Sequence, residues 1–181
     1  MNSQELFIIP FKGLSVGTHL FEWTIDKGFF TAYEMSEIDH ADINVQVTLI
    51  KHDQFLEIDF LLEGWAEVPC DRCLDPLSLD IKTEAKLYVK FGDASSGEED
   101  PGDGHDVIIL PPDEDKLNVA QYLYEYAHLG LPIKRVHPDD SSGKSMCNED
   151  MISHLEKYLV KEKNNPDIDP RWNDLKNIFD N

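Results

Sequence analysis

The strongest constraint on the fold is a two-residue alternation of apolar and polar side chains in the first half of the chain. In the clearest stretch, 43–49, aliphatic residues occupy the odd positions and polar residues the even positions. The same period recurs in 21–25, 56–62, 77–81 and 85–91. It is typical of antiparallel strands that place one face on a core and the other in water. We therefore predict an α+β fold with an antiparallel sheet of about six to eight strands in the N-terminal two thirds.

Shorter apolar runs extend this prediction at both ends of the alternating region. The runs 6–11 and 107–110 predict two further short strands, the second of which ends at Pro111-Pro112. Segment 29–35 is a candidate for a short helix.

The last third of the chain has helical spacing, so we expect two or three C-terminal helices. The first is capped by Asn118 and ends at Gly130. Its apolar face comprises Val119, Tyr122, Leu123, Tyr126 and Ala127. The second is capped by Asn148, and its last turn contains Lys161 and Lys163, whose positive charges interact favourably with the negative end of the helix dipole. Its predicted buried stripe comprises Met151, Ile152, Leu155 and Leu159.

The chain organises into one main domain and a short C-terminal extension. We predict a single α+β domain over 1–164, interrupted by a mobile loop at 93–106 that is rich in acids, Ser and Gly and has no Lys or Arg. The alternative is that the acidic loop attracts a basic partner by its negative charge. Residues 165–181 form a hinge and a short helix that starts at Asp169 and Pro170.

Charge limits the classes of partner. Sixteen Lys and Arg residues against 36 Asp and Glu give a formal net charge of −20. A field of this sign repels a phosphate backbone and attracts a basic protein, although it also serves simply to keep a protein in solution. The chain has no run of about 18 apolar residues and no signal-peptide pattern at its N-terminus, so we expect a cytoplasmic protein without a membrane partner.

The segment from Val68 to Leu77 contains the residues best suited to chemistry. Cys70 and Cys73 lie in a turn between two predicted strands, and their separation is that of a zinc-binding pair. Four ligands are needed for a closed structural site. Cys147 and His137 would complete a Cys₃His set that fixes the long polar loop between the first two C-terminal helices to this turn.

Two other interpretations of the cysteines remain open. Free cysteines are often small buried apolar side chains. Alternatively, Cys70 and Cys73 form the thiol pair of a redox enzyme, although such pairs usually precede a helix and this one precedes a strand. The sequence contains no nucleophile elbow, glycine-rich phosphate loop or His-Glu-x-x-His pattern, so no catalytic residue is predicted.

Four motifs in order resemble the YceD family of large ribosomal RNA subunit accumulation proteins. The first is Cys70-Asp71-Arg72-Cys73-Leu74, which matches the Cys-x-Arg-Cys signature of the family. It is followed by Leu131-Pro132 with Val136-His137, then by Cys147, and finally by the Asp-Pro-aromatic-x-x-Leu type of segment at 169–175. The resemblance extends from Leu61 to the C-terminus. Some members have a second Cys-x-x-Cys where this chain has only Cys147, and His137 is then the natural substitute ligand.

The resemblance implies a non-enzymatic ribosome-biogenesis factor that supports accumulation of large-subunit ribosomal RNA. Combined with the acidic charge, it favours a basic ribosomal protein or assembly factor as the partner, with direct binding of that RNA as an alternative. Arg72 is a candidate contact to a phosphate or a carboxylate, or else bridges to a local acid. Pro170, Trp172 and Leu175 either pack the terminal helix onto the sheet or bind a partner.

Overall fold

The computed structural model describes residues 6–92 and 106–159 and divides the chain into two compact units, 1–147 and 148–181. The predicted acidic loop, apart from Asp106, lies outside the described residues. So do the predicted boundary at 164, Lys161 and Lys163, and the terminal helix with Pro170, Trp172 and Leu175. In the described part of the chain, no helix is long and apolar enough to cross a membrane.

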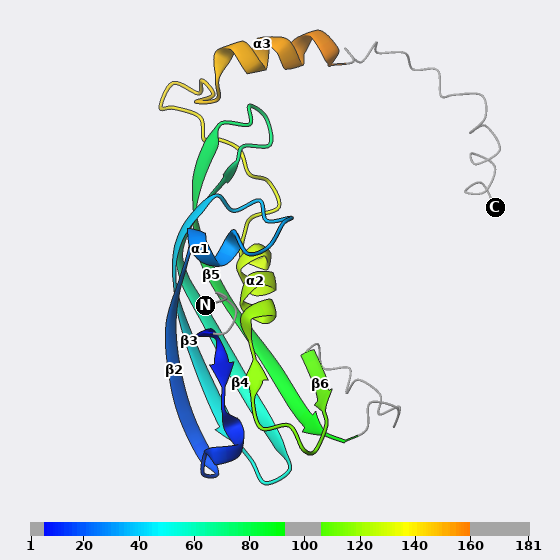
Figure 1. The fold of residues 1–181 in the computed structure, drawn as a ribbon. Coiled ribbons are helices and arrows are strands. Elements are labelled where there is room, and N and C mark those ends of the chain that lie inside the picture. Colours follow the sequence, from blue (N-terminus) through cyan, green and yellow to red (C-terminus); the bar gives the residue numbers. More distant parts are fainter. Residues whose placement is uncertain (1–5, 93–105, 160–181) are drawn as a thin grey trace, which may run out of the picture. The chain divides into compact units, whose positions relative to one another are not determined.

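The first unit is built on a five-stranded sheet with the order β2-β3-β4-β5-β6 (Figure 1). Strands β2 (Gly17–Asp26), β3 (His40–Lys51), β4 (Phe55–Pro69) and β5 (Pro76–Phe91) are consecutive and antiparallel. The α+β class and a mostly antiparallel sheet are thus confirmed, although the main sheet has five strands and not the six to eight predicted. The predicted segments 77–81 and 85–91 form one uninterrupted strand, β5. Strand β6 (Asp106–Leu110) pairs parallel to β5, which the alternation alone did not reveal.

A small second sheet lies near the chain's first described residues. It pairs β1 (Ile8–Ile9) with β7 (Leu117–Asn118), and a 3₁₀ turn, η2 (Phe11–Gly13), follows β1. The predicted strand over 6–11 is therefore only two residues long.

Helix α2 (Ala120–Leu129) covers the inner face of the sheet. Leu123 and Ala127 are fully buried there, and Tyr126 packs edge-to-face on Phe60 of β4. The predicted apolar face of this helix is confirmed. Its start differs by a little from the prediction, because Val119 is the cap residue and Asn118, still in β7, accepts a hydrogen bond from the backbone N–H of Ala120.

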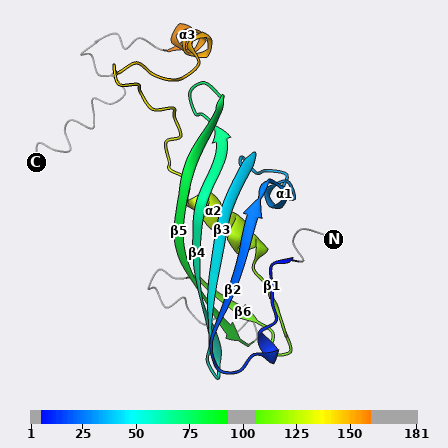
Figure 2. The ribbon, with the colours of Figure 1, turned by 90° about the vertical axis from the view of Figure 1, so that its left-hand side faces the viewer.

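The opposite face of β2–β5, which we call the outer face, is polar. Along β3 and β4, and over most of β5, residues on this face alternate with buried residues of the inner face, whereas in the edge strand β2 the inner-face residues other than Ile25 are half-buried. Figure 2 looks onto the outer face, with α2 behind the strands. None of the described elements of the first unit covers it.

The remaining two helices differ from the predictions. Helix α1 (Lys27–Phe30) is shorter and earlier than the candidate at 29–35, because Asp26 caps it by accepting hydrogen bonds from the N–H groups of Gly28 and Phe29. In the second unit, α3 (Glu149–Tyr158) is capped by Asn148 as predicted. No residue of α3 is buried, so the predicted burial of its apolar stripe is wrong for the described residues.

Candidate metal centre

The turn between β4 and β5 presents two cysteine sulfurs on a fixed backbone. The strands stay paired up to Pro69 and Pro76, and the turn closes with hydrogen bonds from Cys70 N–H to the Asp75 carbonyl (3.0 Å) and from Leu74 N–H to the Cys70 carbonyl (2.9 Å). Leu74 has a φ of 63°, a left-handed conformation that costs a residue with a side chain roughly 1 kcal/mol. Both sulfurs are nevertheless buried, with Cys70 0% and Cys73 1% exposed.

Asp71 and Arg135 form a reciprocal contact between this turn and the polar loop after α2. Asp71 N–H donates to the Arg135 carbonyl (2.7 Å), and Arg135 N–H donates to the Asp71 carboxylate (2.7 Å). The guanidinium of Arg135 also pairs with Glu37, at 2.6 Å. Three separate segments therefore meet at Arg135, which brings the following residues of the loop next to the cysteines.

Four side chains converge at this point, as the sequence predicted. Cys70, Cys73, His137 and Cys147 each offer one ligand atom, and these four atoms all lie within 4.8 Å of one another. The sulfurs of Cys70 and Cys147 are 3.8 Å apart, and Cys73 Sγ is 3.4 Å from His137 Nδ1. The group could hold a metal ion.

These separations agree with tetrahedral coordination. A zinc ion with Zn–S bonds of about 2.3 Å and a Zn–N bond of about 2.0 Å separates ligand sulfurs by about 3.8 Å, and sulfur from nitrogen by about 3.5 Å. Three soft thiolates with one imidazole are a donor set that zinc favours. The residue types and these two distances are therefore compatible with a closed structural zinc site.

The backbone also orients the imidazole for coordination. His137 Nε2 donates to the carbonyl of Pro76, at 3.1 Å, which leaves Nδ1 as the unprotonated nitrogen of the neutral ring. Nδ1 is the atom that faces Cys73. An outer hydrogen bond of this type fixes the tautomer and the ring orientation of a metal-binding histidine.

Electrostatics in the cluster favour thiolates. Burial raises the pKa of the Cys70 thiol, but hydrogen bonds from backbone N–H groups of the turn and of His137 outweigh it and lower this pKa to about 6. A hydrogen bond with the Ser145 hydroxyl lowers the pKa of Cys147 against the opposing effect of burial. Burial lowers the pKa of His137, but the interactions with the sulfurs of Cys147 and Cys70 and the hydrogen bond to the Pro76 carbonyl together raise it by more. Thiolate is the form that binds metals.

Arg72, the cationic residue of the signature turn, is partly buried in the same region. Its NH2 group donates to the His137 carbonyl at 3.4 Å, and its Nε is buried without a hydrogen-bond partner among residues 6–92 and 106–159. Asp71, one of its two predicted local partners, pairs with Arg135 instead. A role for Arg72 in partner binding stays a prediction, as does the same role for Pro170, Trp172 and Leu175.

Sequence reasoning missed the residues that support the centre. Arg135, Glu37 and Ser145 were not singled out, and the Pro76 carbonyl is a backbone group that no side-chain pattern reveals. The sequence offered one indication of these residues, which is that Arg135 lies two positions before the candidate ligand His137.

Comparison with known proteins gives one match. The model of the family described as large ribosomal RNA subunit accumulation protein YceD matches residues 58–179, which is more than half of the chain and includes all four candidate ligands. This chain belongs to the YceD family. The description of that family implies a role in accumulation of the large ribosomal RNA subunit and names no enzymatic reaction. No curated protein and no solved structure matches the chain.

Proposed function

We propose that this YceD-family chain is a non-enzymatic ribosome-biogenesis factor in the cytoplasm, which supports accumulation of large-subunit ribosomal RNA by binding a basic protein. In this proposal one zinc ion, held by Cys70, Cys73, His137 and Cys147, fixes the loop after α2 to the β4–β5 turn. The zinc ion is structural, because all four coordination positions are filled by protein and none is left for a substrate.

The observation that carries the proposal is the convergence of the four ligands inside the region that the family model matches. Residues 131–147 contain no helix or extended strand, only an isolated bridge between Asp139 and Ser145. Exposed loops of this kind have little apolar surface to bury, so a metal ion is an effective means of ordering them.

The net charge of −20 supports a basic protein as the direct partner. Electrostatic attraction speeds association with a cationic surface and disfavours approach to nucleic-acid phosphates. We therefore propose a basic ribosomal protein or assembly factor, with the effect on ribosomal RNA following from that interaction.

Two measurements test the function. Purified full-length protein is expected to contain about one zinc atom per chain, and Cys73→Ser to contain almost none. In cells that lack the endogenous protein, the wild-type chain is expected to restore large-subunit ribosomal RNA to normal levels and Cys73→Ser to restore it poorly. His154→Gln, which removes a histidine of α3 outside the centre, serves as the control. Failure of the wild-type chain to restore the RNA would contradict the proposal.

The lowered pKa of Cys70 favours one alternative, a thiol redox protein that uses the Cys70 and Cys73 pair. A redox protein would be purified without metal and would catalyse exchange between a dithiol and a small disulfide. Absence of zinc together with such exchange would replace the structural role by the redox role.

A further inference from the structure

An exposed tryptophan lies between carboxylates on the outer face of the sheet. The strand register places Asp26, Asp42, Trp65 and Asp80 in one row across β2, β3, β4 and β5. Trp65 is 40% exposed, although a large aromatic side chain in a monomeric protein is normally buried. The row therefore combines an accessible aromatic ring with a carboxylate on each adjacent strand.

The charges in this row are unfavourable for the isolated protein. Asp26 lies directly across from Asp42, and like charges at directly opposed positions destabilise a sheet. Asp26 is also used as the cap of α1. Among the described residues, no Lys, Arg or His forms an ion pair with Asp42 or Asp80, although Glu57, Asp59 and Glu63 of the same face pair with lysines.

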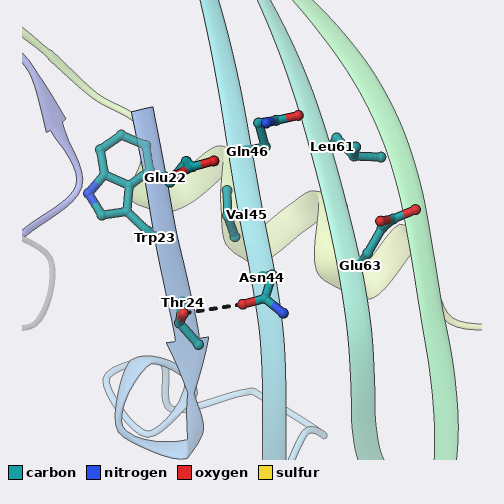
Figure 3. Close-up of a pocket in the computed structure, with 8 residues that line it drawn as sticks. All are labelled: Glu22, Trp23, Thr24, Asn44, Val45, Gln46, Leu61 and Glu63. Atoms are coloured by element: carbon teal, nitrogen blue, oxygen red, sulfur yellow. Dashed lines mark hydrogen bonds between the residues drawn. The ribbon is translucent and has the colours of Figure 1, made fainter. Parts of the chain in front are cut away.

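A depression of about 550 Å³ adjoins the row on the same face (Figure 3). Asn44 and Gln46 of β3 form its floor, and Glu22 of β2 and Glu63 of β4 lie on its two sides. Thr24 donates a hydrogen bond to the Asn44 side chain. The depression offers the carboxylate of Glu22 and two amides, and on its other side Glu63, which already pairs with Lys82. It therefore suits a second cationic side chain, next to the one that Trp65 would accept.

We infer that the outer face around Trp65 binds an arginine-bearing segment of a protein partner. A guanidinium stacks on the indole ring of Trp65 and donates to Asp42 or Asp80, while a neighbouring basic side chain enters the depression between Glu22 and Glu63. Arg suits this arrangement better than Lys, because its planar group can stack on an aromatic ring and donate to a carboxylate at the same time. This inference rests on the proposed function and assigns the surface that receives the basic partner.

The experiment measures binding of a short peptide of alternating Arg and Gly residues to the full-length protein by calorimetry. Asp42→Asn/Asp80→Asn and, separately, Trp65→Ala are each expected to weaken binding by about tenfold. The control is Asp113→Asn/Asp115→Asn, which removes the same charge from exposed positions before β7 and is expected to leave the affinity unchanged. The corresponding Lys peptide is expected to bind more weakly than the Arg peptide.

Equal weakening by the two double variants would mean general attraction to an acidic protein and would overturn the inference. Unchanged binding in Asp42→Asn/Asp80→Asn and Trp65→Ala, with unfolding transitions like that of the wild type, would overturn it as well. So would binding of large-subunit ribosomal RNA at this face, detected as RNA affinity lost in the same variants while the Arg peptide does not bind.

The same variants separate this inference from the proposed function. Loss of peptide binding and of ribosomal RNA restoration in Asp42→Asn/Asp80→Asn, at normal zinc content, supports both. Loss of peptide binding with full restoration overturns the assignment of the partner to this face and leaves the proposed function intact. A wild-type chain that binds the peptide but restores no RNA overturns the proposed function.

Discussion

The sulfurs of Cys70 and Cys147 lie 3.8 Å apart although 77 positions separate the two residues in the chain. Such a separation is that of two ligands on one tetrahedral zinc ion. Cys147 is also the last residue of the first unit, so this contact attaches the C-terminal end of the unit to the β4–β5 turn. Stability of the loop and occupancy of the centre should therefore change together.

Cys147→Ser is expected to lose zinc and to lower the unfolding temperature. A ligand that binds the folded state about 1,000-fold above its dissociation constant stabilises that state by about 4 kcal/mol, which corresponds to roughly 8–16 °C for a chain of this size. Calorimetry with and without a chelator checks the prediction. The chelator should shift the wild-type transition and have no effect on Cys147→Ser; an equal shift in both would exclude this site.

Removal of the metal from the wild-type protein is expected to open the loop while the sheet stays folded. The amides of Asp71 and Met146, which donate to Arg135 and Pro138, should exchange at least about tenfold faster after chelation. The amide of Val47, in the centre of β3, provides the internal control. Hydrogen exchange measured by mass spectrometry or NMR distinguishes local opening from global unfolding, in which all three amides would accelerate equally.

Arg135→Met is expected to weaken the attachment of the loop without removing a metal ligand. It deletes the ion pairs with Glu37 and Asp71 but keeps the two backbone hydrogen bonds to Asp71, so the cost should be about 0.5–1.5 kcal/mol. Denaturant titration measures this cost, and zinc competition should show weaker binding. Arg135→Lys retains the charge, so its unfolding free energy and zinc affinity should lie between those of Arg135→Met and the wild type. An Arg135→Met protein with wild-type zinc affinity would contradict the role of this residue.

A pH-dependent contribution to stability is expected from Glu57 and Lys86 on the outer face. The hydrogen bond from Lys86 lowers the pKa of Glu57 from its ordinary value, against the opposing effect of burial. A carboxylate with a lowered pKa in the folded state stabilises that state above its unfolded pKa and loses the effect as pH falls through the folded pKa. Lys86→Met should therefore be less stable than the wild type by at most about 1 kcal/mol at pH 7, with the difference shrinking as the pH is lowered toward 3. A difference that stays constant between these pH values would contradict the assignment.

Gly64→Ala is expected to destabilise the sheet by about 1–3 kcal/mol or more. A Cβ at position 64 would lie 2.1 Å from the backbone oxygen of Asp42 in β3, so the neighbouring strand would have to move. Gly13→Ala is the matched control, because nothing lies within 4 Å of the corresponding Cβ. Similar unfolding free energies for the two variants would show that the strands adapt without cost.

The sheet and the face of α2 could be predicted because both depend on local periodicity. Burial of Val45 and Val47 next to exposed Asn44 and Gln46 follows directly from the alternation of side chains along a strand. The direction of β6 could not be predicted in this way, since parallel and antiparallel strands have the same side-chain period. The extent of α1 depended on Asp26, whose capping role emerges only once β2 is known to end there.

The candidate ligands could be named because a chain with three cysteines offers few ways to complete a four-ligand site. Their spacing could not be predicted, since it depends on the pairing of Asp71 with Arg135 across 64 positions. Contacts of this range are set by the packed fold and leave no periodic trace in the sequence.

The unbroken pairing of β4 with β5, from Phe55–Lys90 to Pro69–Pro76, limits how this hairpin can change in length during evolution. A single inserted or deleted residue in either strand would exchange the inner and outer faces beyond that point. It would also rotate the turn that carries Cys70 and Cys73 away from His137. Related chains that keep the two cysteines should therefore conserve the length of this hairpin and accommodate indels in exposed loops.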